Sequence, residues 1–147
     1  MEKINLYIEN NKQFFQCDPG ISLSELSNMV SPGCKYPVLA ALEDNMLKEL
    51  SEKVYTSHTI EFVDYTHPDG RRTYVRSLCF LLQRAVSLLY PDNTLFIDYA
   101  LPNGMYGELR KREADGTYTT VPAGADTIAA LLNKMKEMVK EDIPFVK

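Results

Sequence analysis

The chain has 147 residues, which is enough for one ordinary domain or two very small ones. Hydrophobic residues make up 45% and charged residues 24%, which argues against a disordered chain. The net charge of −4 argues against a protein that coats nucleic acid in general, and no apolar run approaches the roughly 18 residues of a membrane span.

The cysteines and the N-terminus indicate the cellular compartment. Three cysteines, Cys17, Cys34 and Cys79, are an odd number without a CxxC pair, which argues against both a disulfide framework and a zinc site. Residues 1–5 lack the apolar core of a signal peptide. We therefore expect a cytoplasmic chain with reduced thiols that binds no membrane, no metal and no cofactor.

Residues 1–64 have the pattern of a small sheet with one helix. Four segments alternate or are apolar throughout in the manner of strands: residues 3–9, 12–17, 38–42 and 59–63. Ser22 and Glu25 form a capping-box pattern that starts a helix, and Pro32 ends the helix because proline cannot continue it. The order strand, strand, helix, strand, strand predicts a ubiquitin-like β-grasp, with a core that includes Leu26, Val38, Leu42, Ile60 and Phe62.

Residues 65–147 have the pattern of a second subdomain, so the whole chain is predicted to be α+β. Pro68-Asp69-Gly70 marks the boundary by its turn chemistry. A long amphipathic helix, a β-hairpin or meander with a turn at Asn103-Gly104, a further turn at Asp115-Gly116 and a C-terminal helix follow. The long helix spans residues 73–89, and its apolar face consists of Val75, Leu78, Cys79, Leu82, Ala85, Val86 and Leu89. The C-terminal helix is capped by Asp126 and ended by Ile143-Pro144. Its apolar face consists of Ile128, Leu131, Leu132, Met135, Met138 and Val139.

Several features of residues 1–64 match a known β-grasp unit. They are Pro19-Gly20-Ile21-Ser22-Leu23-Ser24-Glu25-Leu26, the apolar strand that follows, Asp44-Asn45, Leu50-Ser51 and Thr59-Ile60-Glu61-Phe62. This set resembles a TGS domain, the β-grasp unit of threonyl-tRNA synthetases, certain GTPases and the stringent-response enzymes. The resemblance implies a TGS-like domain at residues 1–64.

A second match begins in the long helix. It consists of Arg76-Ser77-Leu78-Cys79-Phe80-Leu81-Leu82, Ala85-Val86, Leu89-Tyr90-Pro91, Ile97, Asn103-Gly104-Met105-Tyr106 and the end at Asp142-Ile143-Pro144-Phe145. The pattern is similar to the start of the second N-terminal domain of threonyl-tRNA synthetase, where the family has HSxxHLL and, further on, NGFY. The resemblance implies that residues 65–147 are similar to the beginning of that editing domain.

The chain departs from the family pattern at the two positions that carry the editing histidines. Arg76 and Phe80 occupy the positions of the two histidines of HSxxH, which face the editing cleft in the family. The two histidines of this chain, His58 and His67, lie elsewhere. Deacylation needs a group that positions or deprotonates water, so we expect no editing activity and no catalytic residue.

The same arrangement without the histidines also resembles the N-terminal region of some bacterial uridine or nucleoside kinases. The chain has no GxxxxGK(S/T) motif, so a kinase domain would have to follow it. The sequence therefore predicts a non-catalytic regulatory or ligand-binding module whose partner is a downstream kinase domain. Two alternatives stay open: a tRNA- or RNA-binding module of a threonyl-tRNA synthetase-like protein, and a structural module that sets oligomerisation.

The candidate ligand site lies on the long helix. Arg76, Phe80 and Arg84 are successive i, i+4 neighbours and form one row, which suits a nucleotide or another small anion. Arg72 beside Arg71 is a further candidate. A solvated helix face, or a Phe80 packed under the hairpin, is the alternative. The nine tyrosines show no ladder of the kind that a nucleic-acid-stacking sheet carries.

Overall fold

The computed structural model describes residues 2–143 and 145; Met1, Pro144, Val146 and Lys147 lie outside the described residues. Three helices and several sheets confirm the predicted α+β class. The chain divides into two compact units, Met1–Arg76 and Ser77–Lys147, whereas the sequence places a division after residue 64. Within the described residues no helix is long and apolar enough to cross a membrane.

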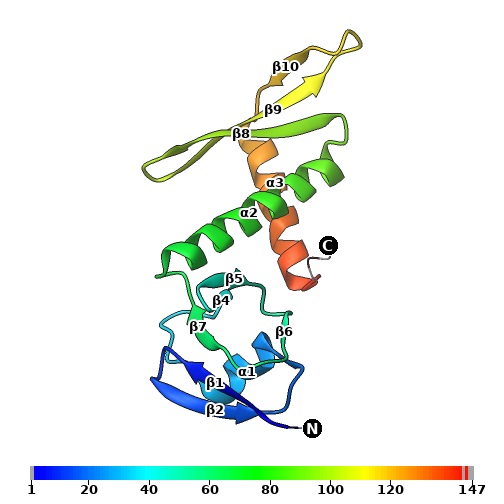
Figure 1. Cartoon of the computed structure of the whole chain (residues 1–147). Coiled ribbons are helices and arrows are strands. Elements are labelled where there is room, and N and C mark those ends of the chain that lie inside the picture. Colours follow the sequence, from blue (N-terminus) through cyan, green and yellow to red (C-terminus); the bar gives the residue numbers. More distant parts are fainter. Residues whose placement is uncertain (1, 144, 146–147) are drawn as a thin grey trace. The chain divides into compact units, whose positions relative to one another are not determined.

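The first unit contains a five-stranded sheet in the order β2-β1-β7-β4-β5 (Figure 1). Its strands are β1 (Ile4–Ile8), β2 (Gln13–Cys17), β4 (Ala40–Glu43), β5 (Met46–Lys48) and β7 (Thr59–Val63). β1 and β7 are parallel, and the other neighbours are antiparallel. Two short strands, β3 (Ile21–Ser22) and β6 (Lys53–Val54), pair beside this sheet. The arrangement confirms the β-grasp and adds β3, β5 and β6 to the predicted strands.

Helix α1 (Leu23–Val30) begins at the predicted capping box. The Ser22 hydroxyl accepts a hydrogen bond of 3.2 Å from the backbone N–H of Glu25, and the Glu25 carboxylate accepts one of 3.0 Å from the backbone N–H of Ser22. Both bonds satisfy donors that have no partner inside the helix. The helix ends at Ser31, which adopts φ 46°, directly before Pro32.

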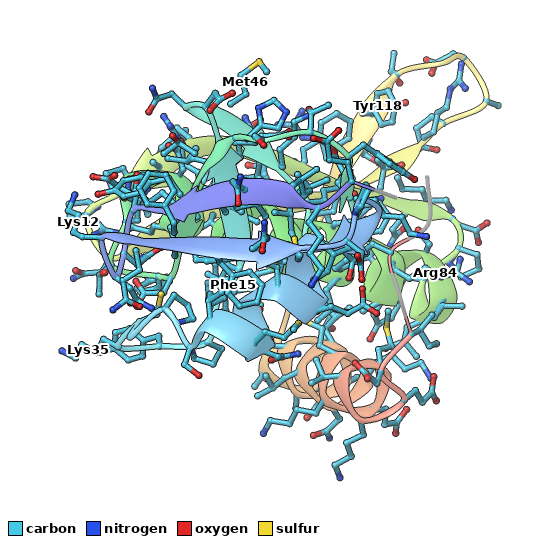
Figure 2. All side chains as sticks on the ribbon, turned by 60° about the horizontal axis from the view of Figure 1, so that its bottom comes forward. Lys12, Phe15, Lys35, Met46, Arg84 and Tyr118 are labelled. Atoms are coloured by element: carbon cyan, nitrogen blue, oxygen red, sulfur yellow. The ribbon has the colours of Figure 1, made fainter. Side chains whose placement is uncertain are left out.

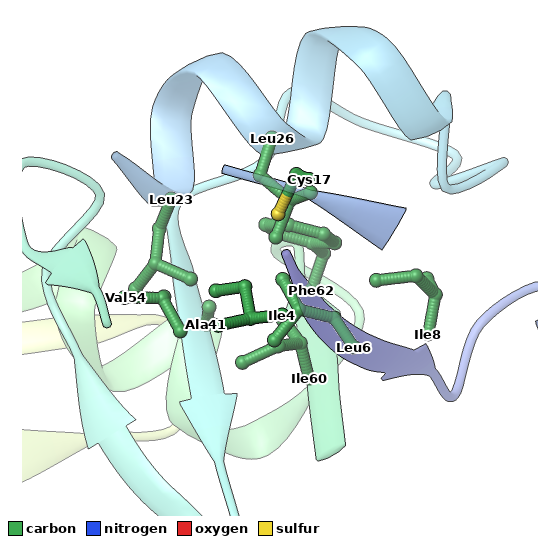
Figure 3. Close-up of a cluster of buried hydrophobic side chains, with 10 residues drawn as sticks. All are labelled: Ile4, Leu6, Ile8, Cys17, Leu23, Leu26, Ala41, Val54, Ile60 and Phe62. Atoms are coloured by element: carbon green, nitrogen blue, oxygen red, sulfur yellow. The ribbon is translucent and has the colours of Figure 1, made fainter. Parts of the chain in front are cut away.

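The core of the first unit lies between α1 and the sheet (Figure 3). Leu26, Ile60 and Phe62 are buried there, as predicted. Leu42 is also buried, as predicted, but it belongs to a separate cluster. Because side chains alternate along a strand, Ala41 takes the core face of β4 and Leu42 packs on the other face with Ala40 and Val63. The remaining buried members of the main cluster are Ile4, Leu6, Ile8, Cys17, Leu23 and Val54, and the half-buried Val38 packs against them.

Helix α2 (Pro68–Leu89) begins earlier than predicted. Pro68-Asp69-Gly70, which was predicted to be a turn between the subdomains, is the first turn of this helix. Proline suits this position because it has the φ angle of a first helical residue and lacks an N–H that would need a partner. Gly70 is buried against the preceding segment: a Cβ atom at this position would lie 1.9 Å from the backbone oxygen of Asp64. The helix can therefore start here only with glycine at its third residue.

The second unit contains a three-stranded antiparallel sheet in the order β10-β9-β8 and helix α3 (Ala125–Lys140). Its strands are β8 (Asn93–Leu101), β9 (Gly104–Arg112) and β10 (Tyr118–Val121), which form the meander that was predicted as the alternative to a single hairpin. The predicted hairpin is present, but its turn is Pro102-Asn103, since Gly104 already pairs with Leu101. The predicted cap is also wrong: Gly124 is the N-cap of α3, and its carbonyl accepts from the N–H of Ile128.

The core of the second unit is small. Leu109 of β9, Leu131 of α3 and two residues of α2, Ala85 and Val86, are its buried members. Large parts of the predicted helix faces remain accessible: Leu78, Leu89, Ile128, Leu132 and Val139 are exposed. Helix α3 ends at Lys140, before Ile143, and the predicted helix-ending Pro144 lies outside the described residues.

Candidate functional site

The predicted row on α2 is accessible. Arg76, Phe80 and Arg84 are all exposed, Phe80 with 61% of its surface free. The Phe80 ring contacts the Phe145 ring edge to face, with centroids 5.3 Å apart and an interplanar angle of 69°. This partner differs from the predicted alternative, in which the hairpin covers Phe80. Because the division of the chain falls after Arg76, Arg76 belongs to the first unit and Phe80 and Arg84 belong to the second.

Arg72 is already engaged by a carboxylate. Its guanidinium forms an ion pair with Asp69, which lies three residues earlier on the first turn of α2. The hydrogen bond from Arg72 lowers the pKa of Asp69. Arg72 is therefore a weaker candidate for an anion contact than Arg76 and Arg84, for which the described residues show no ion pair.

His58 has partners that the sequence did not reveal. Its Nδ1 lies 2.6 Å from the Asp44 carboxylate, and its Nε2 lies 2.6 Å from the hydroxyl of Thr56. The other oxygen of Asp44 accepts a 2.9 Å bond from the N–H of Thr59, and this bond and the contact with His58 lower the pKa of Asp44. The row of hydroxyl, imidazole and carboxylate thus joins the β4–β5 turn to the start of β7. Within the described residues no group of His, Cys, Asp and Glu has an arrangement that would hold a metal ion.

A pocket of about 340 Å³ opens beside this row in the first unit, but it does not suit an anion. Three of its lining residues are the acids Glu9, Asp44 and Glu61. Carboxylates this close would repel the phosphates of a nucleotide. The remaining lining residues are Leu42, Asn45 and Thr59.

A group of tyrosines in the first unit was missed by the sequence analysis. Tyr65 packs edge to face against Tyr36, with centroids 6.4 Å apart, and against Tyr74, with centroids 5.1 Å apart. The Lys35 amine lies 5.3 Å from the Tyr36 ring centroid, and the Arg71 guanidinium carbon lies 5.8 Å from that of Tyr65. We call these five residues the tyrosine cluster. No spacing along the chain connects its three segments, so periodicity could not have found it.

The carboxylate of Asp64 holds two segments of the tyrosine cluster together. It is 5% exposed and accepts bonds of 2.9 Å from the backbone N–H of Tyr36, 2.8 Å from the N–H of Thr66 and 2.5 Å from the Thr66 hydroxyl. The bonds from Thr66 and from Tyr36 lower the pKa of Asp64 to about 2, so it is a carboxylate at neutral pH. It fixes Tyr36 next to Tyr65.

One arginine of the second unit is fully engaged by acids. Arg110 on β9 is bound by two carboxylates, at 2.9 Å by Glu108 and at 3.1 Å by Asp98, and it also lies over the Phe96 ring. These bonds satisfy the guanidinium within the sheet. A phosphate would have to displace both acids to reach it.

Comparison with known proteins points to one class of enzyme. The chain is 27% identical over 128 residues to a threonine–tRNA ligase of Syntrophomonas wolfei, an alignment that covers 87% of this chain and 19% of that protein. The ligase of Acetivibrio thermocellus is 27% identical over 123 residues, with 84% and 18% covered, and that of Francisella tularensis is 25% identical over 127 residues, with 86% and 19% covered. No protein-family model matches the chain. The chain is thus similar along most of its length to about a fifth of these ligases.

Proposed function

We propose that this chain is a non-catalytic RNA-binding module of the kind that a threonyl-tRNA synthetase carries. The observation that carries the proposal is the similarity to threonine–tRNA ligases along 84–87% of the chain. The β-grasp of the first unit supports its assignment as a TGS-like domain. The second unit, with the end of α2, the hairpin and α3, is then the counterpart of the start of the synthetase's editing domain.

The residues on α2 support the non-catalytic part of the proposal. Arg76 and Phe80 occupy the positions at which the family pattern has histidines. A guanidinium stays protonated at neutral pH, and a phenyl ring has no ionisable group. Neither side chain can take a proton from water, so hydrolysis of an aminoacyl ester has no base at this place.

The charge distribution supports local rather than general contact with RNA. The net charge is −4, so the chain as a whole does not attract a phosphate backbone. Arg76 and Arg84 are exposed, and no ion pair engages either of them within the described part of the chain. Arginine binds phosphate through two parallel N–H donors, which suits it to such contacts.

The test is direct binding of tRNA. The purified chain is titrated into a fluorescein-labelled tRNA transcript, and anisotropy is followed between about 50 and 200 mM salt. We expect binding that weakens with salt and that Arg76→Ala and Arg84→Ala each reduce. Absence of binding at the lowest salt, or equal affinity for a double-stranded DNA of the same length, would rule out the proposed function.

Two other functions stay predictions from the sequence. A regulatory module of a uridine or nucleoside kinase would be followed by a P-loop domain, and reading the gene beyond residue 147 tests it. An oligomerisation module would give a stable dimer or higher species in analytical ultracentrifugation. The relatives named above are tRNA ligases, and they favour RNA as the partner over either of these.

A further inference from the structure

We infer that the tyrosine cluster of the first unit, Tyr36, Tyr65 and Tyr74 with Lys35 and Arg71, is a stacking site for unpaired bases of RNA. The inference rests on the proposed function and names the part of the RNA that this unit would contact. It concerns a surface distinct from the row on α2, because the three rings come from the loop before β4, the segment after β7 and the second turn of α2.

The rings are accessible and are arranged so that bases can reach them. Tyr36, Tyr65 and Tyr74 are 45%, 41% and 42% exposed. The two ring pairs are nearly perpendicular, at 87° and 83°, so each contact uses the edge of one ring and one face of the other. Lys35 and Arg71 lie over the rings of Tyr36 and Tyr65, and each tyrosine still keeps more than two fifths of its surface exposed, so ring surface stays accessible in the cluster. Stacking on such a face needs no particular base, since every base presents a π-surface.

Two cations lie where a phosphate chain would follow the bases. Lys35 and Arg71 are exposed and lie over the rings of Tyr36 and Tyr65. Figure 2 shows Lys35 with its side chain directed away from the ribbon. Rings combined with adjacent cations are the arrangement by which proteins hold single-stranded nucleic acid.

The cations stand out because the rest of the unit is acidic. The first unit, residues 1–76, contains five lysines, three arginines and eleven acidic residues. Two acids that are close to the cluster in the sequence are already engaged: Asp64 accepts bonds from Tyr36 and Thr66, and Asp69 pairs with Arg72. The two exposed cations of the tyrosine cluster therefore give an acidic unit a local site that attracts a phosphate chain.

The cluster is held in place before any ligand arrives. The Asp64 carboxylate fixes the backbone of Tyr36 beside Tyr65, and the close approach of Gly70 to the Asp64 backbone fixes the start of the helix that carries Tyr74. Aromatic rings that are already positioned lose little conformational freedom on binding. The same contacts would exist if the rings served only to pack the loop, so the experiment has to separate stacking from folding.

The experiment compares an intact strand with one that has no bases. The full chain is titrated into a fluorescein-labelled single-stranded RNA of about ten nucleotides and into an abasic strand of equal length. Tyr65→Leu removes the central ring, Tyr65→Phe keeps the ring and removes the hydroxyl, and Tyr74→Leu is the second ring deletion. Tyr55→Leu is the matched control, because Tyr55 is a 63% exposed tyrosine of the same unit outside the cluster.

We expect wild type, Tyr65→Phe and Tyr55→Leu to bind the intact strand alike. Tyr65→Leu should bind it about tenfold more weakly and bind the abasic strand like wild type. Circular-dichroism melting verifies that each variant is folded, and if Tyr65→Leu is not folded, Tyr74→Leu gives the result. Equal weakening on both strands, an equal effect of Tyr55→Leu, or no effect of either ring deletion overturns the stacking site.

The two proposals fail in different ways. If wild type binds the tRNA transcript and Arg84→Ala weakens it while Tyr65→Leu and Tyr74→Leu do not, the stacking site is wrong and the RNA-binding function stands. If wild type binds neither tRNA nor the single strand at low salt, both are wrong.

Discussion

The backbone oxygen of Asp64 lies so close to Gly70 that a Cβ atom on Gly70 would be 1.9 Å from it. Real Cβ atoms do not approach backbone atoms to this distance, so any other residue would push the start of α2 away from the segment after β7. Gly70→Ala should therefore destabilise the fold by about 1–3 kcal/mol, although alanine is the better helix former by about 1 kcal/mol. Chemical denaturation monitored by circular dichroism measures the difference.

Gly104→Ala is the control for this substitution. A Cβ atom at Gly104 would meet no atom within 4 Å, and the backbone there does not have the positive φ that only glycine tolerates easily. We expect a change within about 0.5 kcal/mol. A Gly70→Ala variant as stable as Gly104→Ala would show that the helix start can shift freely.

Asp64 should make the stability of the chain depend on pH. The bonds from Thr66 and Tyr36 lower the pKa of Asp64 to about 2 from an ordinary value of 3.8. A carboxyl whose pKa is lower in the folded state stabilises the fold above its unfolded pKa, and this contribution is lost as the pH falls through the folded pKa. We expect Asp64→Asn to melt at a lower temperature than wild type at pH 7, and the difference to shrink between about pH 4 and pH 2.

The exposed Asp92 provides the comparison for this pH series. Asp92→Asn should follow the wild-type melting temperature at each pH. A difference in melting temperature between wild type and Asp64→Asn that stays constant down to pH 2 would mean that the charge of Asp64 does not contribute to stability. Only the shape of its side chain would then matter.

The capping box gives a prediction for the local stability of α1. Ser22→Ala removes the acceptor for the N–H of Glu25 and should cost about 0.5–2 kcal/mol of unfolding free energy. Ser24→Ala changes the same residue type two positions later, where the side chain caps nothing, and should change stability by less than about 0.5 kcal/mol. Urea denaturation of the two variants side by side is the measurement, and equal losses would argue against a capping role.

The arginine row on α2 predicts how the chain responds to small anions. If a nucleotide binds along it, Arg84→Ala should weaken that binding by about tenfold or more, since a charge-assisted hydrogen bond contributes about 1.5–3 kcal/mol. Titration calorimetry with uridine and adenine nucleotides measures the affinity, and Arg112→Ala, another exposed arginine of the chain, is the control. Binding that survives Arg76→Ala and Arg84→Ala would place the ligand elsewhere.

The absence of editing chemistry is a separate expectation. With Arg76 and Phe80 at the family's histidine positions, the chain should leave mischarged tRNA to hydrolyse at the rate of a buffer control. Thin-layer analysis of labelled aminoacyl-tRNA over time tests this. Turnover above the control would show that another group activates water. Thr56 and His58, which contact each other, would then be the first residues to substitute.

The sequence by itself determined the elements that depend on near neighbours. The capping box of Ser22 and Glu25, the stop at Pro32 and the strand Thr59–Val63 involve hydrogen bonds and side-chain alternation within a few residues, and all three are as predicted. The placement of Arg76, Phe80 and Arg84 in one row follows from helical spacing in the same way, whereas the exposure of Phe80 is known only from the structure.

Only the tertiary structure decided the features that depend on where distant segments meet. Pro68-Asp69-Gly70 has the composition of a turn, but it forms the first turn of α2, where the approach of Asp64 leaves room for glycine and no larger residue. The tyrosine cluster joins segments that are far apart in the chain, and the bond between Asp64 and Tyr36 spans 28 positions. A sequence pattern predicts contacts between residues that are a few positions apart. The close approach of Asp64 to Gly70 and the contacts between the tyrosine rings exist only after the sheet and α2 have formed.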